Sequence, residues 1–421
     1  MRVLVINTTE REGGPAIAAY RLTEALKDNG IRAKMLVRDK VTDRVTTVEA
    51  ETSWLTRRSV LCEQRNLALH NHLSRQHRYP LHLGTSGADI TTLPEFLQAD
   101  VIHLHWINDG MLSLDMLQRI VDSGKPVVWT MHDMWAFTGI CHYAHECDNY
   151  MQHCHACPQL NSGHEKDLSY KVFEKKCRLF QSSNIHFIAC SHWLKEMACK
   201  SALLHDRQIT CIPNAVDTKI FHPYSKAEAR LHLHLPSDKQ LLLFVSQYVT
   251  DKRKGFDYLR EALKELVTIH PQWNDKMGLV VVGKDSHIVS MADIPIPVYP
   301  LDYVSDEKMM AEIYNAVDLL TLPSLQDNLP NTVVEAMACG VPCVGFNVGG
   351  VPEMIDHLHN GYVAEFKDTG NFSEGIHWLL TEGDYDMLMR EALRKAMTTY
   401  GETSVAAAHI AVYNTLTGKD E

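Results

Sequence analysis

The strongest constraint on the fold is a regular alternation of short apolar runs with longer segments of helical periodicity, which continues along most of the chain. An apolar run followed by a helical segment is typical of a strand-helix-strand unit, and repeated units build a parallel sheet covered by helices. The runs fall into two series. We therefore expect an α/β protein with two domains, each built on its own parallel sheet.

The two series locate the expected strands and the domain boundary. The strands of the first series are 3–6, 101–104, 127–130, 186–189 and 209–212, and those of the second are 241–245, 279–282, 298–301, 319–322 and 343–346. Between them, 213–236 contains three prolines and few apolar runs, as expected where a chain changes domain. We predict an N-terminal domain at 1–217 with a Cys- and His-rich insertion at 141–158, and a C-terminal domain at 218–395. A last helical segment at 396–421 is expected to pack back on the N-terminal domain.

Composition excludes several classes of protein. The chain has 421 residues, of which 45% are hydrophobic and 22% charged, as in ordinary globular proteins and unlike disordered or fibrous ones. Its net charge of −11 disfavours nucleic acid as a partner. No apolar run approaches the ~18 residues of a membrane span, and the first residues read as a buried strand rather than a secretory peptide. We expect a cytoplasmic protein with reduced thiols.

Two candidate ligand-binding positions follow strands of the N-terminal half. Gly13 and Gly14 stand between the first strand and a helix, where exposed backbone amides attract anions. A flexible turn without a ligand is an equal alternative. His132 and Asp133 follow the strand at 127–130, at the sheet edge where such folds bind ligands. His103, on the preceding strand, is better explained as an inward-facing side chain.

The C-terminal half contains a cationic junction and a pair of carboxylates. Lys252, Arg253 and Lys254 precede Gly255 at a strand-to-helix junction, a suitable cradle for a diphosphate, although a solvated charge run is the simpler alternative. In the stretch 323–342, Asp327 lies in a loop and Glu335 in the following helix. Two carboxylates at this spacing can accept hydrogen bonds from the hydroxyl groups of one sugar ligand. Gly349 and Gly350 form a further turn, and Gly361 is expected in a loop.

These motifs, in this order, resemble the retaining nucleotide-sugar glycosyltransferases of family 4, also called group 1, over nearly the whole chain. That family carries an E-x7-E element within "PS..E......EAMA.G.P", and Asp327 stands for its first glutamate while Glu335 matches the second. The resemblance implies the GT-B architecture, in which two Rossmann-like domains face a central cleft. It also implies that Glu335 binds the ribose of the nucleotide and that Asp327, Asn328 and Leu329 lie near the donor.

Further matches extend the resemblance to the phosphate and sugar sites. Lys254 corresponds to the family lysine that neutralises the donor diphosphate, whereas the usual arginine position reads Ser246-Gln247, and Arg253 or Lys252 would replace that charge. His132 matches the histidine beside the donor sugar. Gly13 and Gly14 match the N-terminal glycine loop, and Gly349 matches the glycine turn. The segment 212–217 resembles "IPNGVD" at the passage between domains, with Ala215 in place of glycine.

The resemblance implies transfer of a sugar from a nucleoside diphosphate donor to an acceptor hydroxyl with retention of configuration. His132, Asp327 and Lys254 are the expected catalytic residues, and no catalytic metal is expected. The acceptor implied is a carbohydrate or lipid-linked glycan of the bacterial surface. The sequence also permits peripheral contact with the inner face of the membrane through Arg57, Arg58 and Arg65, and it gives no oligomeric state. The alternatives are an epimerase or phosphorylase of the same architecture, or a non-catalytic nucleotide-sugar-binding protein.

The Cys- and His-rich insertion suggests a metal. Cys141, Cys147, Cys154 and Cys157 follow one another closely, and the last two form a C-x2-C pair. Four such ligands suit a structural zinc ion that would fix the insertion beside His132. Because the second C-x2-C of the usual pair is missing, four buried thiols without metal are an equal alternative.

Overall fold

The chain folds into two compact units. The computed structural model describes residues 1–421 except 51–53, 71–80, 161–162, 290–292 and 419–421. The side chains of Leu55 and Val289 are also outside the description. The first unit comprises Met1–Pro213 and Val405–Glu421, and the second comprises Asn214–Ser404. The chain therefore leaves the first unit after Pro213 and returns to it after Ser404, where the sequence suggested 217 and 395.

The first unit is built on a seven-stranded sheet in the order β3-β2-β1-β4-β5-β6-β7, and every pair of neighbours is parallel. Its strands are β1 (Arg2–Ile6), β2 (Arg32–Val37), β3 (Thr47–Glu49), β4 (Val101–Leu104), β5 (Val127–Met131), β6 (His186–Ala189) and β7 (Ile209–Cys211). Its helices are α1 (Gly14–Asp28), α2 (Trp54–His70), α3 (Pro94–Gln98), α4 (Leu114–Asp122), η1 (Trp135–Phe137), η2 (Asn149–Met151), α5 (Leu168–Gln181), α6 (His192–Lys200) and α16 (Glu402–Thr417).

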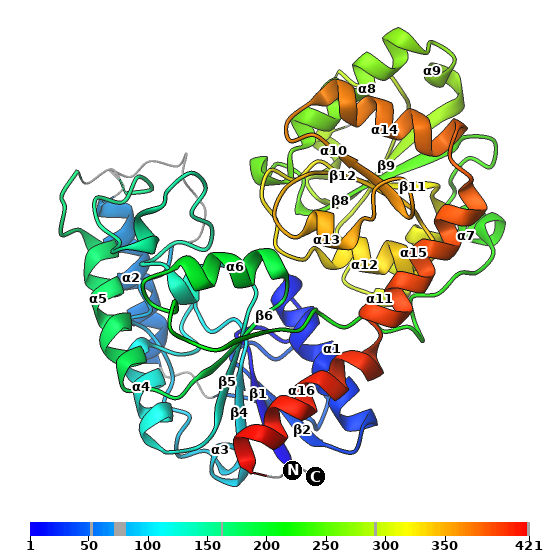
Figure 1. The fold of residues 1–421 in the computed structure, drawn as a ribbon. Helices are drawn as coiled ribbons and strands as arrows, with labels where there is room; N and C mark the ends of the chain where they lie inside the picture. The colour runs from blue at the N-terminus through cyan, green and yellow to red at the C-terminus, as the bar shows by residue number, and fades with distance from the viewer. Residues whose placement is uncertain (51–53, 71–80, 161–162, 290–292, 419–421) are drawn as a thin grey trace. The chain divides into compact units, whose positions relative to one another are not determined.

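The strands are buried on both faces, which is why they read as continuous apolar runs. On one face, alternate residues such as Leu104 and Trp129 join a core with side chains from α4 and α5. On the other face, His103 is fully buried and its Nδ1 lies 2.6 Å from the hydroxyl oxygen of Tyr413 in α16. Figure 1 shows α16, the last helix of the chain, alongside these strands. The interpretation of His103 as inward-facing is confirmed.

The second unit has a six-stranded sheet in the order β10-β9-β8-β11-β12-β13, again parallel throughout. Its strands are β8 (Gln240–Tyr248), β9 (Met277–Lys284), β10 (Val298–Leu301), β11 (Leu319–Leu322), β12 (Cys343–Phe346) and β13 (Gly361–Ala364). Its helices are α7 (Lys226–His232), η3 (Lys252–Lys254), α8 (Phe256–Ile269), α9 (Trp273–Lys276), α10 (Ser286–Val289), α11 (Glu307–Ala316), α12 (Asn331–Ala338), α13 (Val351–Met354), α14 (Thr369–Thr381) and α15 (Tyr385–Thr399).

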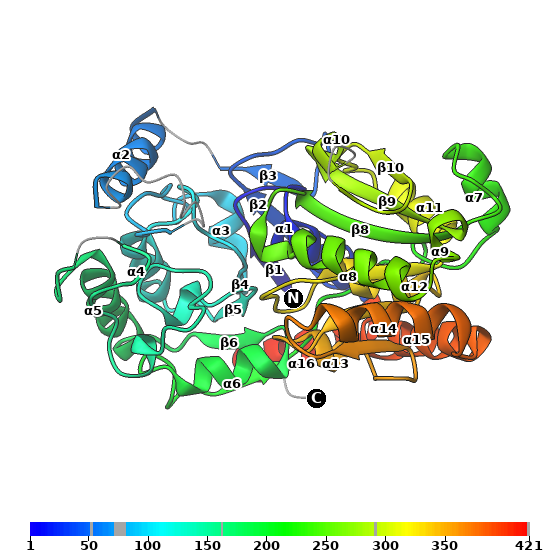
Figure 2. The same ribbon diagram turned by 90° about the horizontal axis from the view of Figure 1, so that it is seen from above.

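In the second unit, too, alternate residues of the strands face the same side of the sheet and form the core. Phe244 of β8 and Phe346 of β12 pack against Leu259 of α8 and Phe372 of α14. Figures 1 and 2 both show α8 and α14 side by side. The prediction of two parallel-sheet α/β domains is confirmed.

Two sequence predictions about local structure were wrong. Gly361 does not lie in a loop but begins β13, where it pairs with Cys343 so closely that a Cβ would lie 2.3 Å from that residue's carbonyl oxygen. The tail also does not form one helix over 396–421. It breaks after α15 because the carbonyl of Tyr400 accepts a hydrogen bond from the amide of Val216.

Among the described residues, none of the helices combines the length and the apolar character needed to cross a bilayer.

Candidate functional site

A compact cluster of charges forms at the carboxyl end of the second sheet. The 3-10 helix η3 follows β8, and the loop after β11 carries Asp327. The ammonium of Lys254 lies 2.5 Å from Asp327 Oδ2, and the guanidinium of Arg253 lies 3.5 Å from the same oxygen. Ser324 donates to this oxygen as well, at 3.3 Å. Two cations therefore meet one carboxylate.

Two glycines allow the loop to approach its neighbours closely. Gly255, which ends η3, has φ 71°, and a Cβ there would lie 1.8 Å from the carbonyl oxygen of Pro323. Gly349 has φ 59°, and its Cβ would lie 1.8 Å from the carbonyl oxygen of Asp327, which also accepts the amide of Gly350 at 3.2 Å. Neither position tolerates a side chain. The glycines thus fix the backbone that carries Asp327.

Burial and ion pairing compete at this cluster. Burial opposes the charged form of Asp327, but Lys254, Arg253 and Ser324 outweigh it, so the pKa of this carboxyl is lowered below its ordinary value. Burial also lowers the pKa of Lys254, and Asp327 acts against that effect. The arrangement holds an anionic carboxylate beside two cationic groups. An anionic ligand can bind these two cations in place of the carboxylate.

The structure distinguishes the two candidates for the missing arginine. Arg253 turns toward the loop, where its Nη1 donates to the carbonyl oxygen of Gln326 at 2.8 Å. Lys252 is exposed. Arg253 therefore lies with Lys254 and Asp327, and Lys252 does not.

Glu335 lies in α12, behind this loop. Its carboxylate is 7% exposed and accepts a hydrogen bond from the hydroxyl of Tyr314 at 2.8 Å. Asn328 and Leu329 connect Asp327 to this helix and are buried. The sequence analysis did not find Tyr314, which lies in α11 and carries no motif of its own. Its role depends on a contact between two helices that sequence periodicity does not report.

At the carboxyl end of the first sheet, Gly13 and Gly14 lie at the start of α1, as expected. Gly13 has φ 88° and no side chain caps the helix. Both glycines are accessible to solvent. The first-turn amides of this 15-residue helix thus form a site that favours an anion.

His132 follows β5 and contacts the side chains of His105 and Cys190. Its Nε2 lies 2.8 Å from His105 Nδ1, and its Nδ1 lies 3.6 Å from Cys190 Sγ. Burial lowers the pKa of His132 to about 4, although Asp133 acts against this, so the ring is neutral at neutral pH. A contact between its ring nitrogens and a sugar would require the release of one of these partners.

Beside His132 is a cavity of about 10 Å³, about the size of one water molecule. His105 and Asn108 line it together with Trp106. Among the described residues, His105 Nε2 and Asn108 Oδ1 are buried without a hydrogen-bond partner. The cavity therefore offers two free polar atoms to one hydroxyl group.

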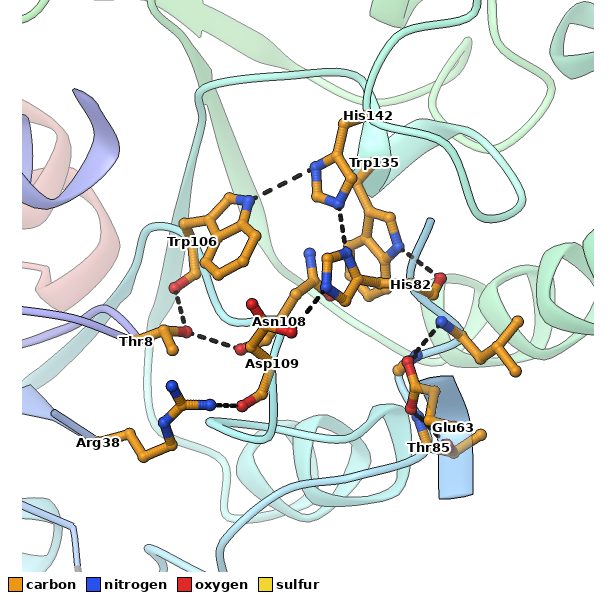
Figure 3. A network of polar contacts seen from close by, with 12 residues as sticks. Thr8, Arg38, Glu63, His82, Thr85, Trp106, Asn108, Asp109, Trp135 and His142 are labelled. Carbon is orange, nitrogen blue, oxygen red and sulfur yellow. Dashed lines mark hydrogen bonds and ion pairs between the residues drawn. The ribbon is translucent and has the colours of Figure 1, made fainter. Parts of the chain in front are cut away.

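A chain of four side chains runs next to this cavity and was not predicted from the sequence. Three of its members, Asp109, His82 and His142, are labelled in Figure 3. His82 Nε2 lies 3.0 Å from Asp109 Oδ1, His82 Nδ1 lies 2.8 Å from His142 Nε2, and His142 Nδ1 lies 2.7 Å from Asp133 Oδ2. All three contacts are hydrogen bonds when the two rings hold three protons, one more than two neutral rings carry. Burial lowers the pKa of His142, and Asp133 acts against that effect. The chain fixes the orientation of Asp133.

The four cysteines predicted to hold zinc line a single small cavity. As the side chains lie, no set of three or more His, Cys, Asp or Glu residues in the described part of the chain is placed so that it could hold a metal ion. The zinc site stays a prediction.

Comparison with known families assigns the chain. The glycosyltransferase family 4 model matches residues 12–220, and the glycosyl transferases group 1 model matches residues 239–382. The chain belongs to the group 1, family 4 glycosyltransferases. This confirms the resemblance and the expected class of enzyme family.

Curated members of the family are distant relatives of this glycosyltransferase. A D-inositol 3-phosphate glycosyltransferase of Acidothermus cellulolyticus is 29% identical over 208 residues, which are 47% of this chain and 46% of the relative. An N-acetyl-alpha-D-glucosaminyl L-malate synthase of Bacillus anthracis is 24% identical over 46% of this chain and 49% of the relative. The chain thus spans about half the length of these curated relatives.

Solved structures resemble the whole chain. A sucrose-phosphate synthase of Thermosynechococcus elongatus has a TM-score of 0.70 at 17% identity and covers 100% of both chains. Anabaena HepE, solved in complex with UDP-glucose, has a TM-score of 0.64 at 13% identity and covers 99% of this chain and 100% of its own. These similarities support the fold.

Proposed function

We propose that this glycosyltransferase moves a sugar from a nucleoside diphosphate sugar to an acceptor hydroxyl with retention of configuration. The observation that carries the proposal is the pairing of Lys254 and Arg253 with Asp327, next to Glu335. An NDP-sugar has a dianionic pyrophosphate beside a ribose and a hexose. The two cations suit the pyrophosphate, and the two carboxylates suit the hydroxyl groups of the ribose and the sugar. The complex of Anabaena HepE with UDP-glucose supports a donor of this kind.

The cations have a catalytic task as well as a binding task. When the glycosidic bond breaks, negative charge grows on the leaving diphosphate, and groups that are already in place stabilise it without reorganisation. In our proposal Lys254 and Arg253 supply this stabilisation from the second unit. The amides of Gly13 and Gly14 form a further anion-binding position.

The contacts of Asp327 favour a positioning role over attack on the sugar. A covalent nucleophile must be a carboxylate that is free to approach the anomeric carbon and is not held by ion pairs, as in retaining hydrolases. Asp327 Oδ2 is engaged by Lys254, Arg253 and Ser324. We therefore propose that retention comes from attack of the acceptor on the same face that the diphosphate leaves.

We assign the acceptor hydroxyl to the carboxyl end of the first sheet. His105 Nε2 and Asn108 Oδ1 line the cavity beside His132 and lack partners within the described residues, and a hydroxyl can both donate and accept there. Asp133, oriented by His142, is the adjacent carboxylate. The acceptor class proposed is a surface glycan or its lipid-linked precursor.

Helix α2 supports peripheral contact with an anionic membrane. Trp54, Leu61 and Leu69 are 66%, 58% and 69% exposed, and the same helix exposes Arg57, Arg58 and Arg65. A helix face that exposes both apolar side chains and arginines can contact the apolar and the anionic parts of a lipid surface. When the protein is centrifuged with vesicles of anionic lipid, it should sediment with them, and replacing the three arginines by glutamate should leave it in the supernatant. The single control Arg390→Glu, on α15, should not.

Turnover tests the proposed reaction. Purified protein with a panel of nucleotide sugars and acceptors should release nucleoside diphosphate only when an acceptor is present. Lys254→Ala and Glu335→Ala should each lower the rate by orders of magnitude while circular dichroism stays unchanged. Sugar isomerisation without diphosphate release would indicate an epimerase instead, and tight binding without turnover would indicate a binding protein. Near-normal rates in both variants would refute the site.

A further inference from the structure

The Cys-rich insertion between β5 and α5 has a built interior that the proposed reaction does not use. Cys141, Cys147, Cys154 and Cys157 all line one cavity of about 20 Å³. Three of the four thiols are buried. The cavity has room for a single atom or ion and is far too small for an iron-sulfur cluster. Four sulfur side chains around a space of this size form a distinctive lining.

The backbone around the cysteines is tightly constrained. Ala156, inside the C-x2-C turn, has φ 40°, and His145, two residues before Cys147, has φ 52°. Residues other than glycine seldom adopt such angles unless the surrounding structure requires them. The amide of Gly139 points at Cys154 Sγ with a donor-to-sulfur distance of 3.2 Å. Amide donors of this kind stabilise a thiolate more than a neutral thiol.

A buried cation lies next to the cavity. The ammonium of Lys176 is fully buried and donates to the carbonyl oxygens of Thr138 and Gly139, at 3.0 and 3.1 Å, and to that of Trp135. Within the described residues it forms no ion pair with a carboxylate. Burial lowers the pKa of Lys176 to about 7, whereas negative charge on Cys154, Cys141 or Asp133 acts against that effect. A buried charge without a counter-ion is costly, and thiolates in this cavity would supply one.

We propose that Cys141, Cys147, Cys154 and Cys157 bind one structural zinc ion, with Lys176 as the buried counter-charge. Binding replaces four S–H bonds by four Zn–S bonds and releases four protons, which leaves a dianionic tetrathiolate centre that the ammonium of Lys176 partly neutralises. Soft thiolate ligands in a tetrahedral set select zinc over harder ions. The proposal is independent of the proposed glycosyl transfer.

The four cysteines line the cavity without meeting at one point. No ready coordination group is present among the described residues, so zinc binding requires the thiols to turn toward the cavity. Rotation about χ1 moves a sulfur by about 3 Å, which is enough to cross so small a cavity.

The position of the centre gives it a structural task. Cys141 is adjacent to His142, and the hydroxyl of Thr138 donates to the carbonyl oxygen of Cys141 at 2.6 Å. Zinc would therefore fix the segment that carries His142 and, through His142, the orientation of Asp133. The insertion would be held by metal bonds where a long loop otherwise has little core of its own.

Elemental analysis of protein purified without chelator tests the proposal. We expect about one zinc per chain, and cobalt reconstitution should give the intense thiolate-to-cobalt absorption of a tetrahedral site. Cys154→Ser should lose the metal, whereas Cys177→Ser, a half-buried cysteine of α5 outside the cavity, should retain it. Lys176→Met should still fold and weaken zinc binding at least tenfold.

Each opposite outcome is decisive. Zinc below about 0.1 per chain together with no cobalt-thiolate absorption in the unaltered protein would show four metal-free thiols and overturn the proposal. Retention of zinc in single serine variants of all four cysteines would overturn the ligand assignment. Because metal content is measured without any acceptor or donor, failure here is independent of failure of the proposed reaction.

Discussion

Lys254 Nζ and Asp327 Oδ2 lie 2.5 Å apart in an ion pair at the carboxyl end of the second sheet. The ammonium of Lys254 is therefore already paired with a carboxylate of the protein, and an incoming pyrophosphate must compete with that carboxylate for it. Asp327→Asn removes the competitor but keeps the side chain's size. We therefore expect Asp327→Asn to bind UDP several-fold more tightly, and to transfer sugar more slowly because sugar positioning is lost. Calorimetric titration with UDP and a turnover assay measure the two effects, and weaker UDP binding would contradict this account.

Tyr314 should tune donor binding without taking part in the reaction. Its hydroxyl donates to the buried carboxylate of Glu335 at 2.8 Å. Tyr314→Phe leaves that oxygen without this donor, which costs roughly 1 to 2 kcal/mol of stability. We expect a several-fold higher KM for the donor with little change in kcat, and a lower Tm by thermal denaturation. Tyr258→Phe in α8 is the matched control and should leave the KM unchanged.

Sequence periodicity predicted the central strands well because residues buried on both faces form apolar runs. It missed β2, where Arg32 and Lys34 alternate with apolar side chains, and β13, which begins with the strand-breaking Gly361. In the site, the carboxylate spacing identified Asp327 and Glu335 because both belong to one local motif. The row of hydrogen-bonded side chains that includes Asp109 and His82 could not be predicted from the sequence, because its members come from separate segments that meet only in the folded protein.

Gly349 should be indispensable for the loop that carries Asp327. Its φ is 59° and an added Cβ would lie 1.8 Å from the carbonyl oxygen of Asp327. Gly349→Ala should lower donor affinity at least tenfold, because the loop must move, while the rest of the unit stays folded. Gly370→Ala is the matched control, since its Cβ would meet only side-chain carboxylates, that of Glu265 at 3.2 Å and that of Asp368 at 3.4 Å. Equal UDP affinity in the two variants, measured by calorimetry, would be evidence against a backbone requirement.

The two histidines His82 and His142 should be energetically coupled. Their facing nitrogens lie 2.8 Å apart in a buried position. Removing one ring therefore leaves the facing nitrogen of the other ring without this hydrogen-bond partner. A double-mutant cycle with His82→Ala and His142→Ala should give a coupling free energy of about 1 to 2 kcal/mol. Hydrogen exchange of peptides from β4 and β5 provides the readout within the first unit. Additive effects would mean that the contact contributes nothing to stability.

Buried neutral histidines should make the first unit sensitive to acid. Burial lowers the pKa of His132 and of His409 to about 4, and it places the pKa values of His103 and His105 well below their ordinary value. Below pH 6.5 the unfolded chain binds protons at these rings and the folded chain does not. Stability therefore falls as the pH drops from 6.5 toward 4, and the loss per histidine is about 2 kcal/mol at pH 5.

The contribution of His409 can be isolated by one substitution. Its Nε2 is buried and lacks a partner among the described residues, and its Nδ1 lies 2.9 Å from the carbonyl oxygen of Val405, so His409→Met removes a titrating group at the cost of one hydrogen bond. Measured by hydrogen exchange in β4, the variant should match the unaltered protein at about pH 7.5 to within 1 kcal/mol. At about pH 5 the variant should be more stable than the unaltered protein, by about 2 kcal/mol more than any difference seen at about pH 7.5. A difference between the two proteins that does not change with pH would mean that His409 is already protonated in the fold, or that α16 opens to solvent before the sheet does.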